Sequence, residues 1–374
     1  MQKVEKEKRV ILLSVCSLLF LLFTFKTSAQ NSVVSTPDGK TISNTRLTSE
    51  IEQIITKEKI PGISIAIINN NEVVYHEVFG VSNLLTKEPI NKQSIFEGAS
   101  LSKPIFAYFA LKMAEEGTLD LDKPLHEYLP HPGIAPESSE DYKLITARMV
   151  LSHQTGFPNH ANDQKIELAF KPGTDFMYSG EAYQYLAAVI GMQKGVGFRE
   201  ELNELFQKKV TKPLTMEHTT FVWDDYLEAH KVYGHDENGK PTQNKPGPGR
   251  WSGKTFNAFS SVHSEASEYA KFIIAMLKRE GMQPERFNEM LKEQTHFKDD
   301  NPLKQEIGQT GWGLGFAQKQ TPNLTMHMHT GNNHDFQAYA MFIPEKEYGL
   351  VVFINCGKMI PFLENLSKVL GPQF

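Results

Sequence analysis

An almost uninterrupted apolar run within the first third of the chain constrains the fold more than any other stretch. Residues 105–113 include Ile105, Phe106, Phe109, Leu111 and Met113, which would point to nearly every side of a helix. A helix that is apolar all round must be buried by other elements. Pro104 is tolerated only in a first helical turn, and Gly117 is the usual residue just past a helix end. The pattern predicts a buried helix that begins near Ser100 and ends by Gly117.

Ser100 and Lys103 lie three positions apart at the start of this predicted helix. Residues with that spacing share one helical face, with Cβ atoms about 5–6 Å apart. A hydroxyl beside an amine, at the positive end of a helix dipole, suits a nucleophile. A Ser-x-x-Lys pattern is also common by chance, and a helix cap beside a solvated lysine explains this stretch equally well on its own.

The composition leaves room for a large core and argues against some partners. The chain has 374 residues, of which 40% are hydrophobic and 22% charged, which suits one large domain or two lobes. Its 39 basic and 44 acidic residues give a net charge of −5, and no basic run indicates a nucleic-acid-binding surface. We therefore expect a small-molecule substrate and no nucleic-acid partner, whereas the oligomeric state stays open.

Residues 1–29 have the three parts of a signal peptide. A cationic start precedes an apolar core over 10–25, and small residues over 27–29 form a cleavage site. The cations are Lys3, Lys6, Lys8 and Arg9. Cleavage near Ala29 and Gln30 would give a periplasmic or secreted protein with no stable membrane partner, and the alternative is an uncleaved membrane anchor. After cleavage Cys356 is the one cysteine left, so we expect no internal disulfide and no cysteine metal site.

Strand patterns occur at both ends of the mature chain, with helical patterns between them. A polar leader over 30–45 is expected to be loose, and the β-branched runs at 63–68 and 73–80 flank an Asn-rich turn. We expect helices at 46–58, 146–151, 181–193, 198–209, 264–280 and 361–370, and later strands at 312–317, 325–329, 337–342 and 349–355. Residues 234–254 are rich in Gly, Pro, Asn and Lys and are expected to form an exposed loop.

This distribution predicts an α/β (α+β) fold in which one antiparallel sheet is built from both termini. Within a single domain over 46–374, the α/β lobe would take about 46–100 and 290–374. A helical lobe would take about 101–289. A cleft between two lobes is the default place for a functional site.

Three further stretches carry residue types that could act together with Ser100. Tyr178 could accept a proton if a nearby cation lowered its pKa, although with 12 tyrosines in the chain a structural tyrosine is the simpler interpretation. Residues His329, Thr330, Gly331 and Asn332 come at the end of an expected strand. Glycine lets backbones approach closely, so the Asn332 N–H could pair with the Ser100 N–H as an oxyanion hole, or the stretch is merely a strand end with a turn. His153 is expected to be a structural hydrogen-bonding residue.

The order of these motifs resembles the serine β-lactamase-like superfamily. In sequence they read Ser-x-x-Lys, Leu-Ser-His-x-x-Gly, Pro-Gly-x-x-Phe-x-Tyr-Ser, Trp-Gly-Leu-Gly-Phe and His-x-Gly, between about Pro61 and Gly357. The chain is most similar to the branch with class C β-lactamases, D-alanyl-D-alanine carboxypeptidases, D-aminopeptidases, and β-lactamase-like esterases and acyltransferases. The resemblance implies a β-lactamase/transpeptidase-like catalytic domain over 46–374.

The resemblance also implies a role for each matching residue. Ser100 would be the acylated nucleophile, Lys103 would assist its deprotonation, and Tyr178 would be the general base that activates water or another acceptor. His329 would contact the substrate or tune Tyr178, and Thr330, Gly331 and Asn332 would complete the substrate-binding and oxyanion region. No metal and no organic cofactor is implied.

Two departures from the family pattern change the expected substrate. Gly180 stands where the family usually has the Asn of Tyr-x-Asn, and that Asn would bind a substrate amide and the lysine. In the late motif, Asp335-Phe336 replaces the usual Gly-Phe. We therefore expect an exported serine hydrolase with an acyl-serine intermediate that acts on ester or amide substrates, with esters favoured. The alternatives are an acyltransferase with an alcohol or amine acceptor, a D-amino-acid peptidase, or a β-lactamase.

Two interpretations from other classes also stay open. His327, His329, His334 and Asp335 superficially resemble the His-x-His-x-Asp-His pattern of a zinc hydrolase, since residues i and i+2 of a strand share a face and imidazoles suit zinc. The residues between them have the wrong spacing, and Ser-x-x-Lys would be left unexplained. The last interpretation is a non-catalytic envelope-binding protein, which would not need Ser100, Lys103 and Tyr178 together.

Overall fold

One antiparallel sheet of nine strands divides the computed structural model, which describes residues 33–162, 164–243, 247 and 253–372. The strands lie in the order β5-β4-β3-β13-β12-β11-β10-β9-β8. Their bounds are β3 (Gly62–Asn69), β4 (Glu72–Asn83), β5 (Glu88–Pro89), β8 (Thr295–His296), β9 (Gly311–Trp312), β10 (Ala317–Thr321), β11 (Leu324–Asn332), β12 (Gln337–Ile343) and β13 (Tyr348–Ile354). The short strands β1 (Val33–Ser35) and β2 (Thr41–Ser43) pair with each other, as do β6 (Phe96–Ala99) and β7 (Val262–Ser264).

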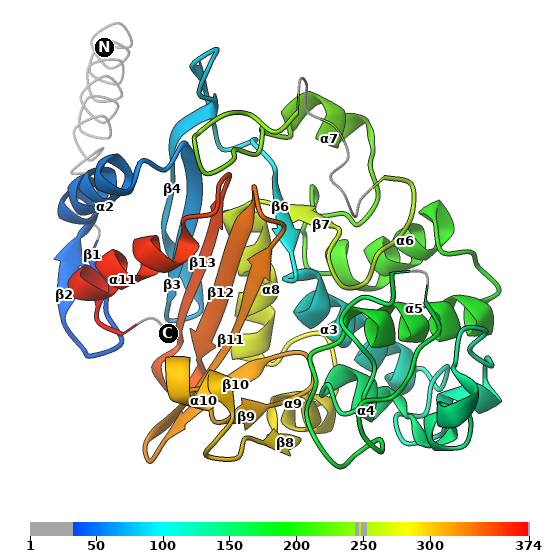
Figure 1. Cartoon of the computed structure of the whole chain (residues 1–374). Coiled ribbons are helices and arrows are strands. Elements are labelled where there is room, and N and C mark those ends of the chain that lie inside the picture. Colours follow the sequence, from blue (N-terminus) through cyan, green and yellow to red (C-terminus); the bar gives the residue numbers. More distant parts are fainter. Residues whose placement is uncertain (1–32, 163, 244–246, 248–252, 373–374) are drawn as a thin grey trace, which may run out of the picture.

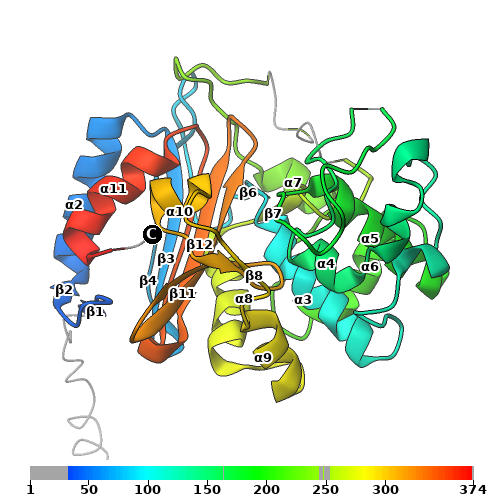
Figure 2. The ribbon, with the colours of Figure 1, turned by 60° about the horizontal axis from the view of Figure 1, so that its bottom comes forward.

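Helices cover both faces of the sheet and form a separate lobe beside it (Figure 1). Helices α2 (Asn44–Glu58) and α11 (Met359–Leu370) cover one face, and α8 (Ala266–Lys278) lies on the other. The lobe contains α3 (Ser102–Glu115), α4 (Ala147–Leu151), α5 (Gly180–Lys194), α6 (Glu200–Phe206) with a π-helical turn (Gln207–Thr211), and α7 (Asp225–His230). Helices α9 (Pro284–Leu291) and α10 (Pro302–Ile307) connect α8 to the late strands. The turned view in Figure 2 shows the same layers.

The sheet is built from both ends of the chain, as the sequence predicted. Early strand β3 pairs with late strand β13, and Ile65 lies opposite Val352. Ile65 packs into the core under α2 and α11, whereas its neighbour Ala66 packs into the core shared with α8 and the helical lobe. This alternation is the period-two pattern of a strand covered on both faces. The predicted Asn turn after β3 is confirmed, with Asn70 and Asn71 both at positive φ.

Helix α3 is the buried helix that the sequence predicted. All of its residues except Lys112 and Glu115 are buried. Pro104 lies in its first turn, and Gly117, just beyond its end, has a φ of 75°. The side chains of α3 pack into one core with α5 and α8, so this helix joins the lobe to the sheet.

The predicted loose leader is partly wrong, because residues 33–43 form the β1–β2 hairpin and α2 starts at Asn44. Val34 pairs with Ile42 and both are buried, in the same core as Leu47 of α2. One facing pair of apolar residues is enough to anchor this hairpin, although the segment is too polar overall for the hairpin to be predicted from composition. The predicted signal peptide over 1–29 lies outside the described residues.

Two other expectations need correction. The expected strand over 312–317 is split between β9 and β10, because Gly315 has a φ of 93° and a Cβ there would lie 2.6 Å from the Ala107 side chain on α3. The chain has to turn where it touches α3. Helix α8, which was assigned to the helical lobe, packs on the sheet instead, with Ile273 against the backbone of Gly349.

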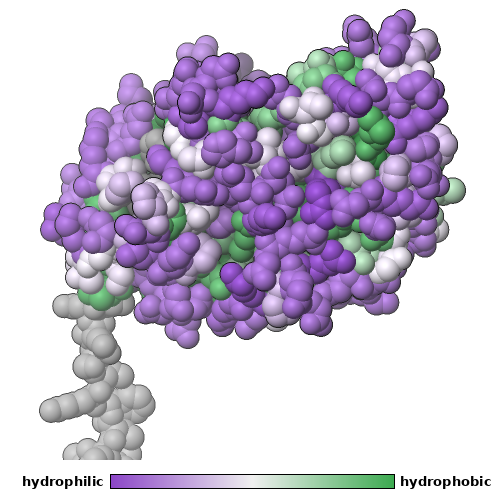
Figure 3. All heavy atoms as spheres, turned by 90° about the horizontal axis from the view of Figure 1, so that it is seen from below, coloured by the Kyte–Doolittle hydropathy of each residue, from purple (hydrophilic) through white to green (hydrophobic). Residues whose placement is uncertain are grey.

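The face shown in Figure 3 is largely hydrophilic, with hydrophobic residues in a few separate groups. This distribution is expected when the apolar side chains fill two cores. Within the described residues, no helix is both long enough and apolar enough to span a bilayer.

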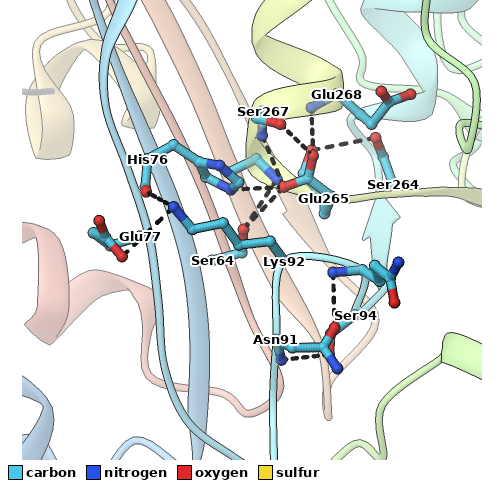
Figure 4. Close-up of polar contacts among 12 residues, drawn as sticks. Ser64, His76, Glu77, Asn91, Lys92, Ser94, Ser264, Glu265, Ser267 and Glu268 are labelled. Carbon is cyan, nitrogen blue, oxygen red and sulfur yellow. Dashed lines mark hydrogen bonds and ion pairs between the residues drawn. The ribbon is translucent and has the colours of Figure 1, made fainter.

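A carboxylate at the start of α8 joins this helix to the sheet (Figure 4). Glu265 accepts hydrogen bonds from the N–H groups of Ser267 at 2.9 Å and Glu268 at 2.7 Å, which makes it the N-cap. Its Oε2 lies 3.0 Å from Nε2 of His76 on β4, and the hydroxyl of Ser64 on β3 accepts from the N–H of Ala266, the first residue of α8, at 3.1 Å. Burial raises the pKa of Glu265, but the hydrogen bonds and charge of His76 and Ser267 outweigh it, so the pKa lies below its usual value.

We expect Glu265→Ala to lower the free energy of unfolding by about 3 kcal/mol, because it removes an N-cap and leaves His76, whose side chain is 14% exposed, without its partner. The N-cap variant Asp224→Ala, at the short helix α7, should cost about 1 kcal/mol or less. Because the folded-state pKa of Glu265 is lowered, its stabilisation is present above about pH 4.5 and is lost as the pH falls through the folded-state value. Urea unfolding of both variants at pH 7 and pH 3.5 measures this, and equal losses in both variants would contradict it.

Candidate active site

Ser100 lies at the boundary between the sheet and the helical lobe, between the end of β6 and the start of α3. The preceding Ala99 has a φ of 47°, a conformation that costs energy for any residue with a Cβ. Ser102, two residues after Ser100, fixes this turn. Its hydroxyl donates to the Ala99 carbonyl at 2.7 Å and accepts from the Val262 N–H at 2.8 Å. Ser100 itself remains half-buried, so its hydroxyl is held at the helix start and is still reachable from outside.

Lys103 is 1% exposed, and its amine points at Ser100. Nζ lies 3.3 Å from the Ser100 Oγ and donates to the carbonyl of Phe259 at 3.0 Å. Burial lowers the pKa of Lys103 well below the usual lysine value. The neutral amine that burial favours could accept a proton from the serine.

Tyr178 completes the cluster. The Lys103 Nζ lies 4.5 Å from the centre of its ring. Burial raises the pKa of Tyr178, and the neighbouring Ser100 hydroxyl only partly offsets the rise, so the neutral phenol is the favoured form. Ser100 and Lys103, predicted from one motif, and Tyr178, predicted from another, are therefore in contact.

His153 packs against Tyr178 and helps to position it. Among the described residues, no hydrogen bond joins His153 to Ser100. Its ring centre lies 4.4 Å from that of Tyr178, its Nδ1 accepts from the Ser179 N–H at 3.1 Å, and its carbonyl accepts from Met177. Ser179 then caps helix α5 through the Ala182 N–H. This geometry matches the structural hydrogen-bonding role expected for His153.

The end of β11 comes into direct contact with β6. A Cβ on Gly331 would lie 2.2 Å from the carbonyl oxygen of Gly98 and 3.3 Å from the Ala99 side chain, so only glycine allows this approach. Thr330 precedes this contact and the exposed Asn332 follows it. The stretch predicted as an oxyanion region therefore runs beside the residues that lead into Ser100.

His329 enters the same cluster from β11. Its ring lies 6.0 Å from that of Tyr178 and 5.5 Å from that of Trp312. Burial and the charge of Lys103 lower the pKa of His329 to about 3, so its imidazole is neutral. Nδ1 lies 2.7 Å from the Thr330 carbonyl, which leaves Nε2 as an acceptor with no partner among the described residues.

The space for a family-type Asn at position 180 is filled. A Cβ on Gly180 would lie 2.8 Å from the Asn159 carbonyl oxygen and 2.9 Å from the Phe259 ring. The Phe259 ring is also 5.5 Å from the Lys103 Nζ. An aromatic wall and a backbone carbonyl therefore lie where an amide side chain was expected.

A cavity of about 860 Å³ opens beside Asn332, at the ends of β11, β12 and β13. Asp335 lines it and is hydrogen-bonded to Thr242, and Leu84, Gly357 and Lys358 are also in its wall. The unusual Asp335 thus lies in the wall of a cavity that Ser100, Lys103 and Tyr178 do not line. The expected exposed loop over 234–254 is buried at its start, where His235 accepts from the Leu84 N–H at 3.1 Å.

Several residues of this cluster were not predicted from the sequence. Phe259 contributes a backbone carbonyl to Lys103. Any residue type could supply this carbonyl, so the sequence carries no signal for it. Trp312 was noted only as part of a motif, yet its ring lies 5.0 Å from that of His153. Ser102 belongs to the Ser-x-x-Lys stretch, but nothing in its position showed that its hydroxyl would bridge two strands.

The residues of the zinc alternative do not converge. His327 stacks on Phe342 with ring centres 5.0 Å apart, whereas His334 is exposed in the turn after β11. Over the ranges that the structure describes, no group of three or more His, Cys, Asp or Glu side chains is placed to hold a metal ion.

The sheet, the helical lobe and the serine, lysine and tyrosine at their boundary define a serine β-lactamase-like protein. The Beta-lactamase family model matches residues 47–367, and the chain belongs to this family. "Protein flp" of Staphylococcus aureus (strain MW2) is 26% identical over 335 residues, which cover 84% of this chain and 63% of that protein. A "Beta-lactamase" of Pseudomonas fluorescens is 26% identical over 212 residues, or 53% of this chain and 56% of that protein.

Two solved structures share the fold. The octameric penicillin-binding protein homologue from Pyrococcus abyssi has a TM-score of 0.73 and 23% identity, covering 88% of this chain and 77% of that one. The D-alanine carboxypeptidase AmpC from Burkholderia cenocepacia has a TM-score of 0.70 and 20% identity, covering 87% of this chain and 98% of that one. These neighbours confirm the predicted β-lactamase/transpeptidase-like fold.

We expect Gly331→Ala to displace β6 from β11, because the added Cβ would meet the Gly98 carbonyl. Overpacking of this kind costs about 1–3 kcal/mol. The control Gly197→Ala places its Cβ 3.4 Å from the flexible end of Glu201 and should be tolerated. Thermal unfolding compares the two, and equal melting temperatures would show that β6 and β11 do not constrain each other.

Proposed function

We propose that the protein is a serine hydrolase that acts through an acyl-serine intermediate, with Ser100 as nucleophile. The observation that carries the proposal is the buried Lys103 amine 3.3 Å from the Ser100 Oγ. Membership of the Beta-lactamase family supports acyl-enzyme chemistry. Because the chain spans 63% of the length of the staphylococcal relatives, the activity of this protein is a proposal in its own right.

Lys103 and Tyr178 take different parts because burial acts oppositely on their pKa values. A lowered pKa favours the neutral amine of Lys103, which accepts the Ser100 proton during attack. A raised pKa favours the neutral phenol of Tyr178, which can pass a proton to the leaving group. The N–H groups of Ser100 and Asn332 stabilise the oxyanion, and the Gly331–Gly98 contact supports this by bringing the two segments together.

An ester substrate would be hydrolysed in two stages, acylation of Ser100 and then release of the acyl group by water. The serine oxygen forms a bond to the carbonyl carbon, and its proton moves to Lys103. The bond to the alkoxy group then breaks, and the departing oxygen takes a proton through Tyr178, which releases an alcohol and leaves acyl-Ser100. Water then attacks the acyl carbon and gives a proton to the same pair. The bond between the acyl carbon and the Ser100 oxygen breaks, the serine oxygen takes that proton back, and the acid is released.

Esters are the favoured substrates because Phe259 occupies the place of an amide-binding side chain. At position 180 the Phe259 ring and the Asn159 carbonyl take the place of that side chain, and the Phe259 carbonyl is already bonded to Lys103. An ester needs no such amide recognition. Transfer of the acyl group to an alcohol or amine instead of water is the second candidate, and D-amino-acid peptides or β-lactams are the third. Export to the periplasm or outside the cell is also proposed, from the signal-like residues 1–29 alone.

We expect Ser100 to form a covalent adduct with a serine-reactive phosphonate and a transient adduct with an activated ester. Intact-protein mass spectrometry should show one added group on the parent and none on Ser100→Ala. The control is Ser94→Ala, two residues before β6, where the serine hydroxyl accepts from the Asn91 N–H in a local turn. This variant should be labelled like the parent. A penicillin in the same panel reports on β-lactam recognition. No adduct from any compound would overturn the acyl-serine proposal.

The rate of phosphonate labelling should rise with pH through the pKa of Lys103. Only the neutral amine accepts the serine proton, and burial places its pKa below the usual lysine value of 10.5. Lys103→Met should lose this pH dependence together with most of the rate. Lys112→Met changes a partly exposed lysine on the same helix and should keep the parent profile. A rising limb that survives in Lys103→Met would assign the proton acceptor to another group.

A further inference from the structure

A buried ion pair lies directly behind the strand that leads into Ser100. Glu97 of β6 and Lys231, which follows α7, are 3.0 Å apart between Oε1 and Nζ, with side chains that are 5% and 1% exposed. Burial raises the pKa of Glu97, but Lys231, His263 and Asn333 together lower it below its usual value, so the carboxylate is charged. A buried charge pair is poor evidence for a stabilising role alone, so its contacts decide what it does.

Both members of the pair hold the turn after β11. The second oxygen of Glu97 accepts from Nδ2 of Asn333 at 2.7 Å. Nζ of Lys231 lies 4.6 Å from the centre of the Phe336 ring. The Asn333 N–H also donates to the Phe336 carbonyl at 2.9 Å, which closes the turn. The ion pair therefore contacts both ends of this turn, Asn333 through Glu97 and Phe336 through Lys231. This turn begins at the residue after Asn332.

The same carboxylate is tied to the segments that hold Ser100 and Lys103. Glu97 lies opposite His263 in the β6–β7 pair, immediately before the irregularity that ends at Ala99. Asn333 also approaches the carbonyl of Ser260 at 3.5 Å, and the neighbouring Phe259 carbonyl accepts from Lys103. The Asn333 side chain, held by Glu97, therefore joins β6, the turn after β11 and the loop that carries the lysine acceptor.

We propose that Glu97 is a positioning residue that, through Asn333, fixes the distance between the N–H groups of Ser100 and Asn332. Among the described residues, no hydrogen bond or ion pair joins Glu97 to Ser100. The inference rests on the proposed function for its catalytic consequence. Removal of one oxyanion donor costs about 10²–10³-fold in kcat, so a donor that is displaced but still present should cost about 10–100-fold.

The variants separate positioning from general stability. Asn333→Ala removes the donor and leaves the buried ion pair intact, and Asn333→Asp places an acceptor of the same shape against Glu97. The double variant Glu97→Gln with Asn333→Asp reverses the hydrogen bond and keeps one negative charge beside Lys231. Asn365→Ala is the matched control, because it removes an equivalent half-buried bond, from Nδ2 to the Glu58 carboxylate at 3.1 Å, under the other face of the sheet.

Steady-state kinetics with the ester that labels Ser100 should show kcat about 10–100-fold lower in Asn333→Ala and Asn333→Asp, with KM nearly unchanged. The affinity for a boronic acid, whose tetrahedral adduct places an oxygen between the two N–H groups, should fall by a similar factor. The double variant should recover most of the loss, and Asn365→Ala should match the parent. Parent-like kcat and boronic acid affinity in Asn333→Ala would overturn the proposal, as would a loss that only follows the melting temperature.

Amide hydrogen exchange measured by mass spectrometry tests the same point without activity. Peptides that span 329–336 should exchange faster in Asn333→Ala and not in Asn365→Ala. Unchanged exchange would overturn the positioning role even if the double variant failed to fold. If the parent forms no Ser100 adduct, the proposed function fails, and the exchange result still decides whether Glu97 and Asn333 hold this turn.

Discussion

The burial of the Lys103 amine is the constraint on which the rest of the site depends. An amine that is 1% exposed loses its water, and it is tolerated only where acceptors replace that water and where its pKa falls. The acceptors are the Ser100 hydroxyl and the Phe259 carbonyl, with the Tyr178 ring 4.5 Å away. To bring them together, the start of α3, the loop before β7 and the segment before α5 must meet at one point. That meeting point is where the sheet and the helical lobe join.

The parts of the fold that could be predicted were those where one side-chain period decides the outcome. Helix α3 was recognisable because apolar residues on all its faces leave burial as the one solution. Strand β3 and the Asn turn after it were predictable for the same local reason. Strands β3 and β13, from opposite ends of the chain, had no local sign of pairing, and their union in one sheet followed from the general preference for layered packing.

What could not be predicted depends on contacts between segments far apart in the sequence. Gly315 breaks an expected strand because α3 passes against it, and Gly331 is required because the Gly98 carbonyl approaches it. Neither neighbour is visible in the local sequence. Phe259 acts partly through its backbone, for which sequence carries no signal, and Glu97 looks like any acidic residue in a strand until its burial with Lys231 is known.

The substitution of Asn by Gly at position 180 illustrates this dependence, because it is coupled to Phe259. A Cβ at position 180 would meet the Phe259 ring at 2.9 Å and the Asn159 carbonyl at 2.8 Å, so an Asn side chain has no room unless both neighbours move. The Phe259 carbonyl binds the Lys103 amine, so a backbone shift that moved Phe259 aside would also move the acceptor of the lysine. Restoring Asn alone would therefore disturb the lysine before it offered an amide to a substrate. Gly180, Phe259 and Lys103 form one unit, and the substrate preference of this chain lies in that unit rather than in the glycine alone.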